Sequence, residues 1–469
     1  MRDTLIKSWI IALALLPGMA AAQSSREEAW RWCARQDTAI SRQTQIAGCS
    51  WLIDSGQETP QYQAIAFYSR GIARAALNDQ SGAMHDYTEA IRADPQNTTS
   101  FNLRGLLRAA QGDRTGAISD YTEAIRLNPQ AADAFNNRGF ARNAEGDRLG
   151  AIADYNEAIR LNPQFALAFN NRGFAKAGQG DREGAIIDYN EAIRLNPQFA
   201  LAFNNRGASR AWQGDRASAI ADYNEAIRLN PRLAIAFDNR GRVRADEGDR
   251  DGAIADYTEA IRLNPQSANT FNNRGLARAG QGDRAGAIAD YTEAIRLNPQ
   301  FFNAFNNRGR VRDAQGDRVG SIADYTEAIR LNPQFALAYN NRGAARSWQG
   351  DSAGAIADYS EAIRLNPQDA NTFNNRGLAR AGVGDRAGAI ADYTEAIRRN
   401  PQYAQAYNNR GFSRAALKDF AGAIADYNEA IRLDPKLADA FNNRADARSA
   451  LGDRAGAMAD FREALRIDR

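Results

Sequence analysis

A proline recurs every 34 residues along most of this chain, and this period limits the fold more than any other feature. Eleven prolines keep the spacing without a gap: Pro95, Pro129, Pro163, Pro197, Pro231, Pro265, Pro299, Pro333, Pro367, Pro401 and Pro435. A 34-residue unit with two amphipathic stretches cannot bury its apolar side chains alone, so neighbouring units must stack into a continuous core. The sequence therefore predicts one array of helical repeats, whose function resides on a surface.

Each repeat has residues that are typical of the beginning and end of two helices joined by a short turn. Residues 132–165 are the reference repeat, in which Ala132 is position 1. Gly146, at position 15, suits the left-handed turn that ends a first helix, and Asp147 can accept the free amide groups that begin a second. Pro163, at position 32, then prevents further helix before the next repeat.

Apolar residues recur three and four residues apart within the repeat, as on the buried face of a helix. The reference repeat carries Phe135, Ala151, Tyr155 and Ile159 in this pattern. Position 8, Gly139 here, is glycine in eleven of twelve repeats. A glycine inside a helix costs about 1 kcal/mol relative to alanine. We therefore expect close helix packing to require it.

The repeat pattern has an aromatic residue at position 4, Gly at 8, Ala at 20, Tyr at 24, Ala at 27 and Pro at 32. It resembles the tetratricopeptide repeat family, in the bacterial variety with Asn-Arg-Gly in the first helix. The resemblance covers residues 64–469 as twelve tandem repeats. It implies an all-α, right-handed superhelical solenoid of antiparallel helix pairs. Residues 23–63 are expected to form a degenerate N-terminal helical repeat or cap.

Residues 1–22 have the pattern of a secretory signal peptide. Arg2 and Lys7 precede an apolar run from Trp9 to Leu16, and small residues occupy positions 20–22. This apolar run is too short for a permanent membrane span, although an uncleaved membrane anchor is the alternative. We expect a bacterial protein that is periplasmic or secreted, with no stable membrane insertion after the signal is removed.

Cysteine and histidine are scarce. Cys33 and Cys49 are the only cysteines, and an oxidising compartment would permit a disulfide that braces the weak terminal repeat. The alternative, a redox-active pair, lacks the Cys-x-x-Cys spacing of dithiol catalysts. His85 is the only histidine. We therefore expect no catalytic residues, no metal site and no cofactor.

Charged residues follow the repeat closely. Position 7 is arginine in all twelve repeats, as at Arg206, and position 11 is arginine in all but one, which has Lys176. Like charges one turn apart repel, so Asp at position 23 and Glu at position 26 are the expected counter-charges. We interpret the lattice as ion pairs that fix the register of the helices, with anion binding as the alternative.

Asparagine occupies position 6 in ten repeats, although it is a mediocre helix former. In the resembled family, positions 2, 5, 6, 9, 12 and 13 line the concave face, and the position-6 asparagine often bonds the backbone of a bound peptide. Hydrogen bonding to a neighbouring helix or to water is the alternative. The predicted ladder consists of Asn137, Asn171, Asn205, Asn239, Asn273, Asn307, Asn341, Asn375, Asn409 and Asn443.

The groove positions that vary between repeats are apolar in two stretches. We predict Phe174, Leu201, Trp212 and Trp348 as ligand contacts, because a tryptophan among aliphatic residues is a typical anchor. The alternative is that both tryptophans only cover the turn between helices. The further members of the two stretches are Leu167, Ile235 and Leu337, and a polar interval of Arg242, Asp246, Arg310 and Asp313 separates them.

These observations favour a non-catalytic scaffold or adaptor that binds a protein or an extended peptide on the concave surface. The alternative is a structural spacer or self-assembling element of an envelope complex. An enzyme is not expected, because no segment outside the repeats is large enough for a catalytic domain. The formal net charge of +3 is close to neutral for 469 residues, so the chain lacks the strongly basic character of nucleic-acid-binding proteins. No small-molecule substrate is indicated.

Overall fold

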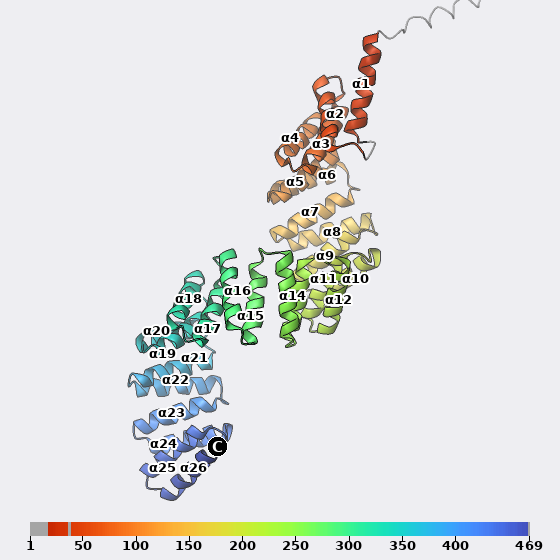
Figure 1. The fold of residues 1–469 in the computed structure, drawn as a ribbon. Coiled ribbons are helices and arrows are strands. Elements are labelled where there is room, and N and C mark those ends of the chain that lie inside the picture. Colours follow the sequence, from red (N-terminus) through yellow and green to blue (C-terminus); the bar gives the residue numbers. More distant parts are fainter. Residues whose placement is uncertain (1–16, 36–38, 468–469) are drawn as a thin grey trace, which may run out of the picture. The chain divides into compact units, whose positions relative to one another are not determined.

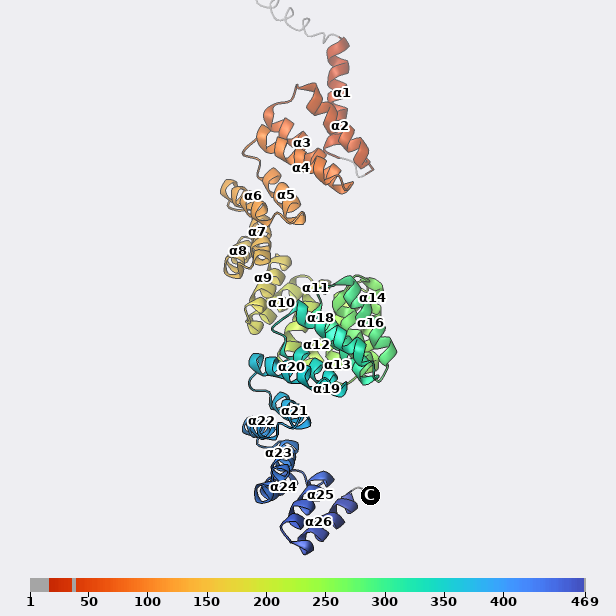
Figure 2. The ribbon, with the colours of Figure 1, turned by 90° about the vertical axis from the view of Figure 1, so that its left-hand side faces the viewer.

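The computed structural model describes residues 17–35 and 39–467, and the regular elements of these residues are all α-helices. They form two compact units, one that ends at Pro231 and one that begins at Arg232. The predicted all-α fold of antiparallel helix pairs is confirmed. Within each unit, every helix packs against the helices before and after it in the chain (Figures 1 and 2).

The first unit contains α1 (Pro17–Cys33), α2 (Arg42–Ser55), α3 (Pro60–Ala76), α4 (Gln80–Ala93), α5 (Thr98–Ala110), α6 (Arg114–Leu127), α7 (Ala132–Glu145), α8 (Arg148–Leu161), α9 (Ala166–Gly178), α10 (Arg182–Leu195), α11 (Ala200–Trp212) and α12 (Arg216–Leu229). The second unit contains α13 (Ala234–Asp246), α14 (Arg250–Leu263), α15 (Ala268–Gly280), α16 (Arg284–Leu297), α17 (Phe302–Ala314), α18 (Arg318–Leu331), α19 (Ala336–Trp348), α20 (Ser352–Leu365), α21 (Ala370–Gly382), α22 (Arg386–Arg399), α23 (Ala404–Ala416), α24 (Phe420–Leu433), α25 (Ala438–Ala450) and α26 (Arg454–Ile467).

The turn between the two helices of a repeat has the geometry that its sequence predicts. Gly146 ends α7 with a φ of 94°, the left-handed conformation that glycine adopts most easily. The Asp147 side chain then accepts the backbone N–H of Gly150 at 2.9 Å and caps α8. Asn78 and Lys418 hold the same left-handed position in two other repeats, so a side chain there is tolerated.

The core of each repeat depends on a glycine beneath a tyrosine ring. Tyr155, from α8, is 1% exposed and lies over Gly139 of α7. A Cβ atom on Gly139 would lie 2.8 Å from Cε1 of this ring and 3.1 Å from the Ala151 carbonyl oxygen, closer than packed atoms tolerate. The repeat that has Ala445 at this position has Phe461 in place of the tyrosine. Close helix packing therefore outweighs the low helix propensity of glycine.

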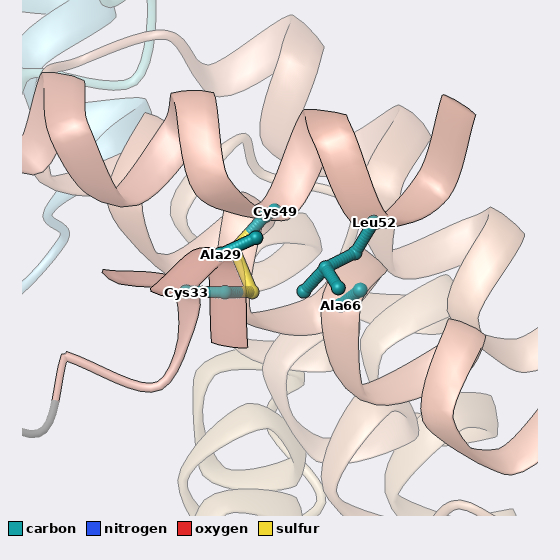
Figure 3. Packing of buried hydrophobic residues seen from close by; sticks show 5 residues of the cluster. All are labelled: Ala29, Cys33, Cys49, Leu52 and Ala66. Carbon is teal, nitrogen blue, oxygen red and sulfur yellow. A yellow bond between two sulfur atoms is a disulfide. The ribbon is translucent and has the colours of Figure 1, made fainter. Parts of the chain in front are cut away.

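A disulfide joins the first two helices of the first unit (Figure 3). Cys33 ends α1 and Cys49 lies in α2, and both side chains are fully buried beside Leu52 and Ala66. Gln45 adds a hydrogen bond of 3.0 Å to the Cys33 carbonyl oxygen. The disulfide thus holds α1 against a small apolar cluster to which α2 and α3 also contribute.

A second group of contacts also holds α1 in place. Arg26 donates two hydrogen bonds, of 2.8 and 2.9 Å, to the Glu58 carboxylate, and the Trp30 indole N–H donates a third at 3.1 Å. The Glu58 side chain is 1% exposed, and these hydrogen bonds, that from Arg26 above all, lower its pKa. The Trp30 ring also packs edge-on against Tyr62 of α3.

Most of the expected signal peptide lies outside the described residues. Residues 1–16 are not described, and residues 17–22 begin α1. Within the part of the chain that the structure covers, no helix has an apolar stretch long enough to cross a bilayer. Removal of residues 1–22 stays a prediction.

Candidate binding surface

The arginine at position 7 joins three elements of the array. Arg206, in α11, donates to both carboxylate oxygens of Asp222, at 2.6 and 3.0 Å, and Arg210 donates to the same carboxylate at 2.9 Å. The remaining Nη1 atom of Arg206 donates to the side-chain oxygen of Asn190 in the preceding repeat at 2.7 Å. The Arg206 guanidinium also lies 5.3 Å from the Phe203 ring centre. Asp222 is 3% exposed, so this cluster is part of the core.

The same two ion pairs, from positions 7 and 11 to Asp at position 23, occur in all twelve repeats. The prediction of register-fixing ion pairs is therefore confirmed within each repeat. The link to the preceding repeat is a hydrogen bond to a neutral oxygen at position 25, so the ion pairs do not run from repeat to repeat.

Glutamate at position 26 is not a counter-charge for these arginines, and that expectation is wrong. Glu157 instead pairs with Arg160, three residues later on α8, with 2.5 Å between Oε1 and Nη2. The hydrogen bond from Arg160 lowers the pKa of Glu157. Both side chains lie on the exposed surface of the second helix. Residues three apart on a helix are neighbours, so Arg160 is the arginine that Glu157 contacts.

The asparagines at position 6 form a chain of amides between repeats. Asn171 donates from Nδ2 to the Oδ1 atom of Asn136 in the preceding repeat at 3.0 Å, and the Nδ2 atom of Asn170 donates to Oδ1 of Asn171 at 3.3 Å. One N–H of the Asn171 amide is thereby used, and an amide nitrogen carries two. The ladder thus has an internal role, and its contact with a ligand stays a prediction.

Seven further position-6 asparagines make the same bond to position 5 of the preceding repeat, at 2.9 to 3.4 Å. They are Asn137, Asn205, Asn307, Asn341, Asn375, Asn409 and Asn443. Asn273 bonds the carboxylate of Asp238, the one acidic residue at position 5, and Asn239 is buried.

Large apolar side chains are exposed on the first helices of the first unit. Phe140 and Phe174, both at position 9, are 59% and 57% exposed, and Leu167 and Leu201 at position 2 are also exposed. Positions 2, 6, 9 and 13 share one side of a helix. We call this side, with position 12, the first-helix face.

Both predicted tryptophans lie on the first-helix face at position 13. Trp212 is 71% exposed, and the Arg182 guanidinium of the preceding repeat lies 4.4 Å from its ring centre. Trp348, in the second unit, is 77% exposed and faces Arg318 at 5.9 Å. Each ring therefore spans a junction between two repeats and keeps most of its surface in solvent.

Three pockets occur at the same place in three different repeat junctions. Each is lined by positions 9 and 12 of one first helix, positions 17 and 24 of the following second helix, and positions 6, 9 and 10 of the next first helix. Their volumes are about 170, 340 and 270 Å³ in chain order. Phe174, Asn205 and Trp212 meet in the first pocket, whereas Leu201 does not line it.

The other two pockets lie in the second unit and differ in chemistry. The pocket between α15 and α17 contains Arg284 and Arg310 with Asn307. The pocket between α23 and α25 contains Phe412, Phe420 and Asp446, again with an asparagine at position 6. The backbone framework is thus constant, and the variable positions set what each junction can accept.

Sequence comparison places the repeats within one family. A family model described as "TPR repeat" matches residues 105–146, 143–180, 241–282 and 348–384. A second model, described as "Tetratricopeptide repeat", matches residues 170–234, 272–334 and 374–438. A third model with the same description matches residues 438–469. The chain belongs to the tetratricopeptide repeat family.

Solved tetratricopeptide repeat structures share low sequence identity with the chain. The APC/C hetero-tetramer Cut9-Hcn1 is 14% identical over 96% of this chain and 95% of that one, with a TM-score of 0.47. MamA is 25% identical over 35% and 96%, with a TM-score of 0.32. YrrB, described as a TPR protein with an unusual peptide-binding site, is 23% identical over 39% and 95%, with a TM-score of 0.32. No curated protein matches the chain.

No group of histidine, cysteine, aspartate and glutamate in residues 17–35 and 39–467 is arranged to hold a metal ion. Burial raises the pKa of Tyr155, at position 24, so this tyrosine stays neutral and serves the packing of the core.

Sequence reasoning missed the arginine at position 17, the first residue of most second helices. Arg182, Arg284 and Arg318 all contribute to the first-helix side of a junction. The available signal was that position 17 differs in some repeats, as at Phe420, while its neighbour Asp at position 16 does not vary. A residue that varies beside a constant cap is a candidate for a ligand contact.

Proposed function

We propose that this tetratricopeptide repeat protein is a non-catalytic scaffold that holds a protein or an extended peptide on its first-helix face. One observation carries the proposal. The arginines, aspartates and tyrosines that recur at positions 7, 11, 23 and 24 are buried or bonded to each other, whereas the large apolar residues that vary, such as Phe174 and Trp212, are exposed beside a pocket. Exposed aromatic side chains around a pocket are typical anchors for a partner.

The energetics favour binding over a purely structural role for these side chains. Trp212 gains little from folding, because 71% of its surface stays in water. A partner that covers the ring would gain about 25 cal/mol for each Å² of apolar surface removed from water. Arg182, which already lies on one ring face at 4.4 Å, limits the freedom of the ring before a partner arrives.

The asparagine ladder is proposed to support the same ligand. Eight of the position-6 amides use one N–H in a bond to an asparagine of the preceding repeat, as Asn205 does with Asn170 at 3.1 Å. The second N–H is available to a backbone carbonyl of an extended chain. Asn205, Asn307 and Asn443 lie in pockets, so they are the members best placed for this role.

The test is capture of partners on immobilised protein. Phe174→Ala with Trp212→Ala removes two exposed rings from the first-helix face. Leu149→Ala with Ile187→Ala is the matched control, because these residues are equally exposed but lie on second helices. We expect the first variant to lose the bound proteins and the control to keep them. Equal capture by both variants would contradict the placement of the site.

We also propose export to the periplasm or the cell exterior, with cleavage after Ala22. The pattern of residues 1–22 supports this, and so does the Cys33–Cys49 bond, because disulfides persist mainly in oxidising compartments. Cell fractionation and N-terminal sequencing of the mature protein test it. A cytosolic protein that begins at Met1 would overturn the proposal.

A spacer role is the second candidate, and one observation favours it. Residues 268–301 and 370–403 differ at only three positions, so part of the array consists of near-copies. A spacer would keep its function when one 34-residue repeat is deleted. A scaffold would lose the pocket that the deletion removes.

A further inference from the structure

The pocket between α15 and α17 differs from its two counterparts in charge. Arg284 begins α16 and Arg310 lies at position 9 of α17, and both guanidinium groups line the same cavity. Neither of them forms an ion pair with another described residue. Two arginines without a counter-charge in one cavity of about 340 Å³ favour an anionic occupant.

The neighbouring carboxylates are already engaged. Asp283 accepts the backbone N–H of Gly286 at 2.9 Å as the cap of α16, and it lies 3.7 Å from Arg278. Asp313, on α17, is paired with Arg318 at 2.8 Å. The positive charge of the pocket is therefore left for a ligand to neutralise.

Small residues keep the two guanidinium groups accessible. Position 13 is Gly280 on one side of the junction and Ala314 on the other. In the Phe174 pocket, the corresponding position holds Trp212, whose ring covers Arg182 and reduces the cavity to about 170 Å³. Arginine at position 17 is thus occupied in one junction and open in the other.

The rest of the lining fits a side chain with an apolar stem. Leu276 and Val311 provide aliphatic surface, and the Asn307 amide adds a polar group. A glutamate side chain has methylene groups for such a surface and a carboxylate that matches the planar fork of arginine.

We propose that the pocket formed by Arg284 and Arg310 binds an acidic side chain, glutamate before aspartate, of the extended polypeptide held on the first-helix face. This assignment rests on the proposed function, because it names the chemistry of one point on the same ligand. The Phe174–Trp212 pocket takes an apolar side chain by the same reasoning. The scaffold thereby selects partners that carry both features.

The experiment is selection from a phage-displayed library of random 12-residue peptides on the full mature protein. The variant is Arg284→Gln with Arg310→Gln, and the charge-matched control is Arg114→Gln with Arg148→Gln, which removes two helix-start arginines elsewhere. Thermal unfolding of each variant establishes that it is folded. We expect wild type and control to enrich acidic peptides and the Arg284/Arg310 variant to lose that enrichment.

A synthetic copy of one selected peptide sharpens the test. Replacing its glutamate by glutamine should weaken binding to wild type about tenfold and leave binding to the Arg284/Arg310 variant unchanged. Selected peptides without acidic enrichment, or with enrichment that survives in the variant, would overturn this inference and leave the scaffold function standing. A library that yields no binders would overturn the inference as well, and the capture experiment would then decide the scaffold function separately.

Discussion

Arg206→Leu tests whether arginine at position 7 is a structural residue of the array. The substitution removes the hydrogen bonds to both carboxylate oxygens of Asp222 and the one to Asn190, and it leaves the buried Asp222 carboxylate with Arg210. Removing one partner of a buried ion pair destabilises a protein by about 3–5 kcal/mol. Because Arg210 remains and leucine buries apolar surface beside Phe203, we expect the lower end, about 3 kcal/mol.

Urea unfolding followed by circular dichroism measures this loss, and hydrogen exchange locates it, since each repeat depends mainly on its neighbours. Arg228→Leu is the control, because its partner Glu225 lies on the exposed surface, and it should unfold like wild type. Adding Asp222→Ala to Arg206→Leu should restore part of the stability by removing a buried carboxylate that has lost one of its two arginine partners. Wild-type unfolding of Arg206→Leu, or loss of partner binding without a change in unfolding, would refute the reasoning.

Three further substitutions follow from single contacts. Gly139→Ala should destabilise the protein by about 1–2 kcal/mol in urea unfolding, because overpacking against Tyr155 exceeds the gain in helix propensity; a more stable variant would show that the ring can move. Lys418→Gly should stabilise it by about 1 kcal/mol in the same assay, because lysine holds a φ of 66° there, and an unchanged midpoint would contradict this. Asp238→Asn should stabilise the protein by about 1–2 kcal/mol at pH 7, because Oδ1 of Asp238 is buried without a hydrogen bond. The measurement is a rise in the melting temperature. Burial raises the pKa of Asp238, so ionisation of Asp238 lowers the stability of the wild type as the pH rises above the ordinary value of 3.8. The stability gained by Asp238→Asn should therefore vanish near pH 4. A gain that persists at pH 4 would contradict the mechanism.

Local features of the repeat could be read directly from the sequence. Gly146, Asp147 and Pro163 each act through a backbone property of one residue type, and the structure places the turn, the cap and the helix end where these residues predict them. The close approach at Gly139 was also predictable, because a costly residue that recurs in a helix needs a packing reason.

Contacts between repeats were harder to predict, because they combine positions that are far apart in the sequence. Within one helix, charge alone did not identify Arg160, three residues away, as the partner of Glu157 in place of the first-helix arginines. The pocket at Arg284 and Arg310 requires residues 26 apart from two different helices. Exposure of Phe174 and Trp212 was expected, whereas the Arg182 guanidinium over the indole was not.

The pockets between repeats have a consequence for how such an array can change over time. Each pocket is assembled from two halves, one from each neighbouring repeat, while the amide and arginine contacts that join repeats recur at most junctions within each unit. Recombination that removes residues 268–301 would therefore preserve a well-joined chain and place Arg310 beside Arg242 and Arg250. A new pocket would arise without any point mutation, so the recognition properties of this protein can be rearranged in whole repeats while its fold is kept.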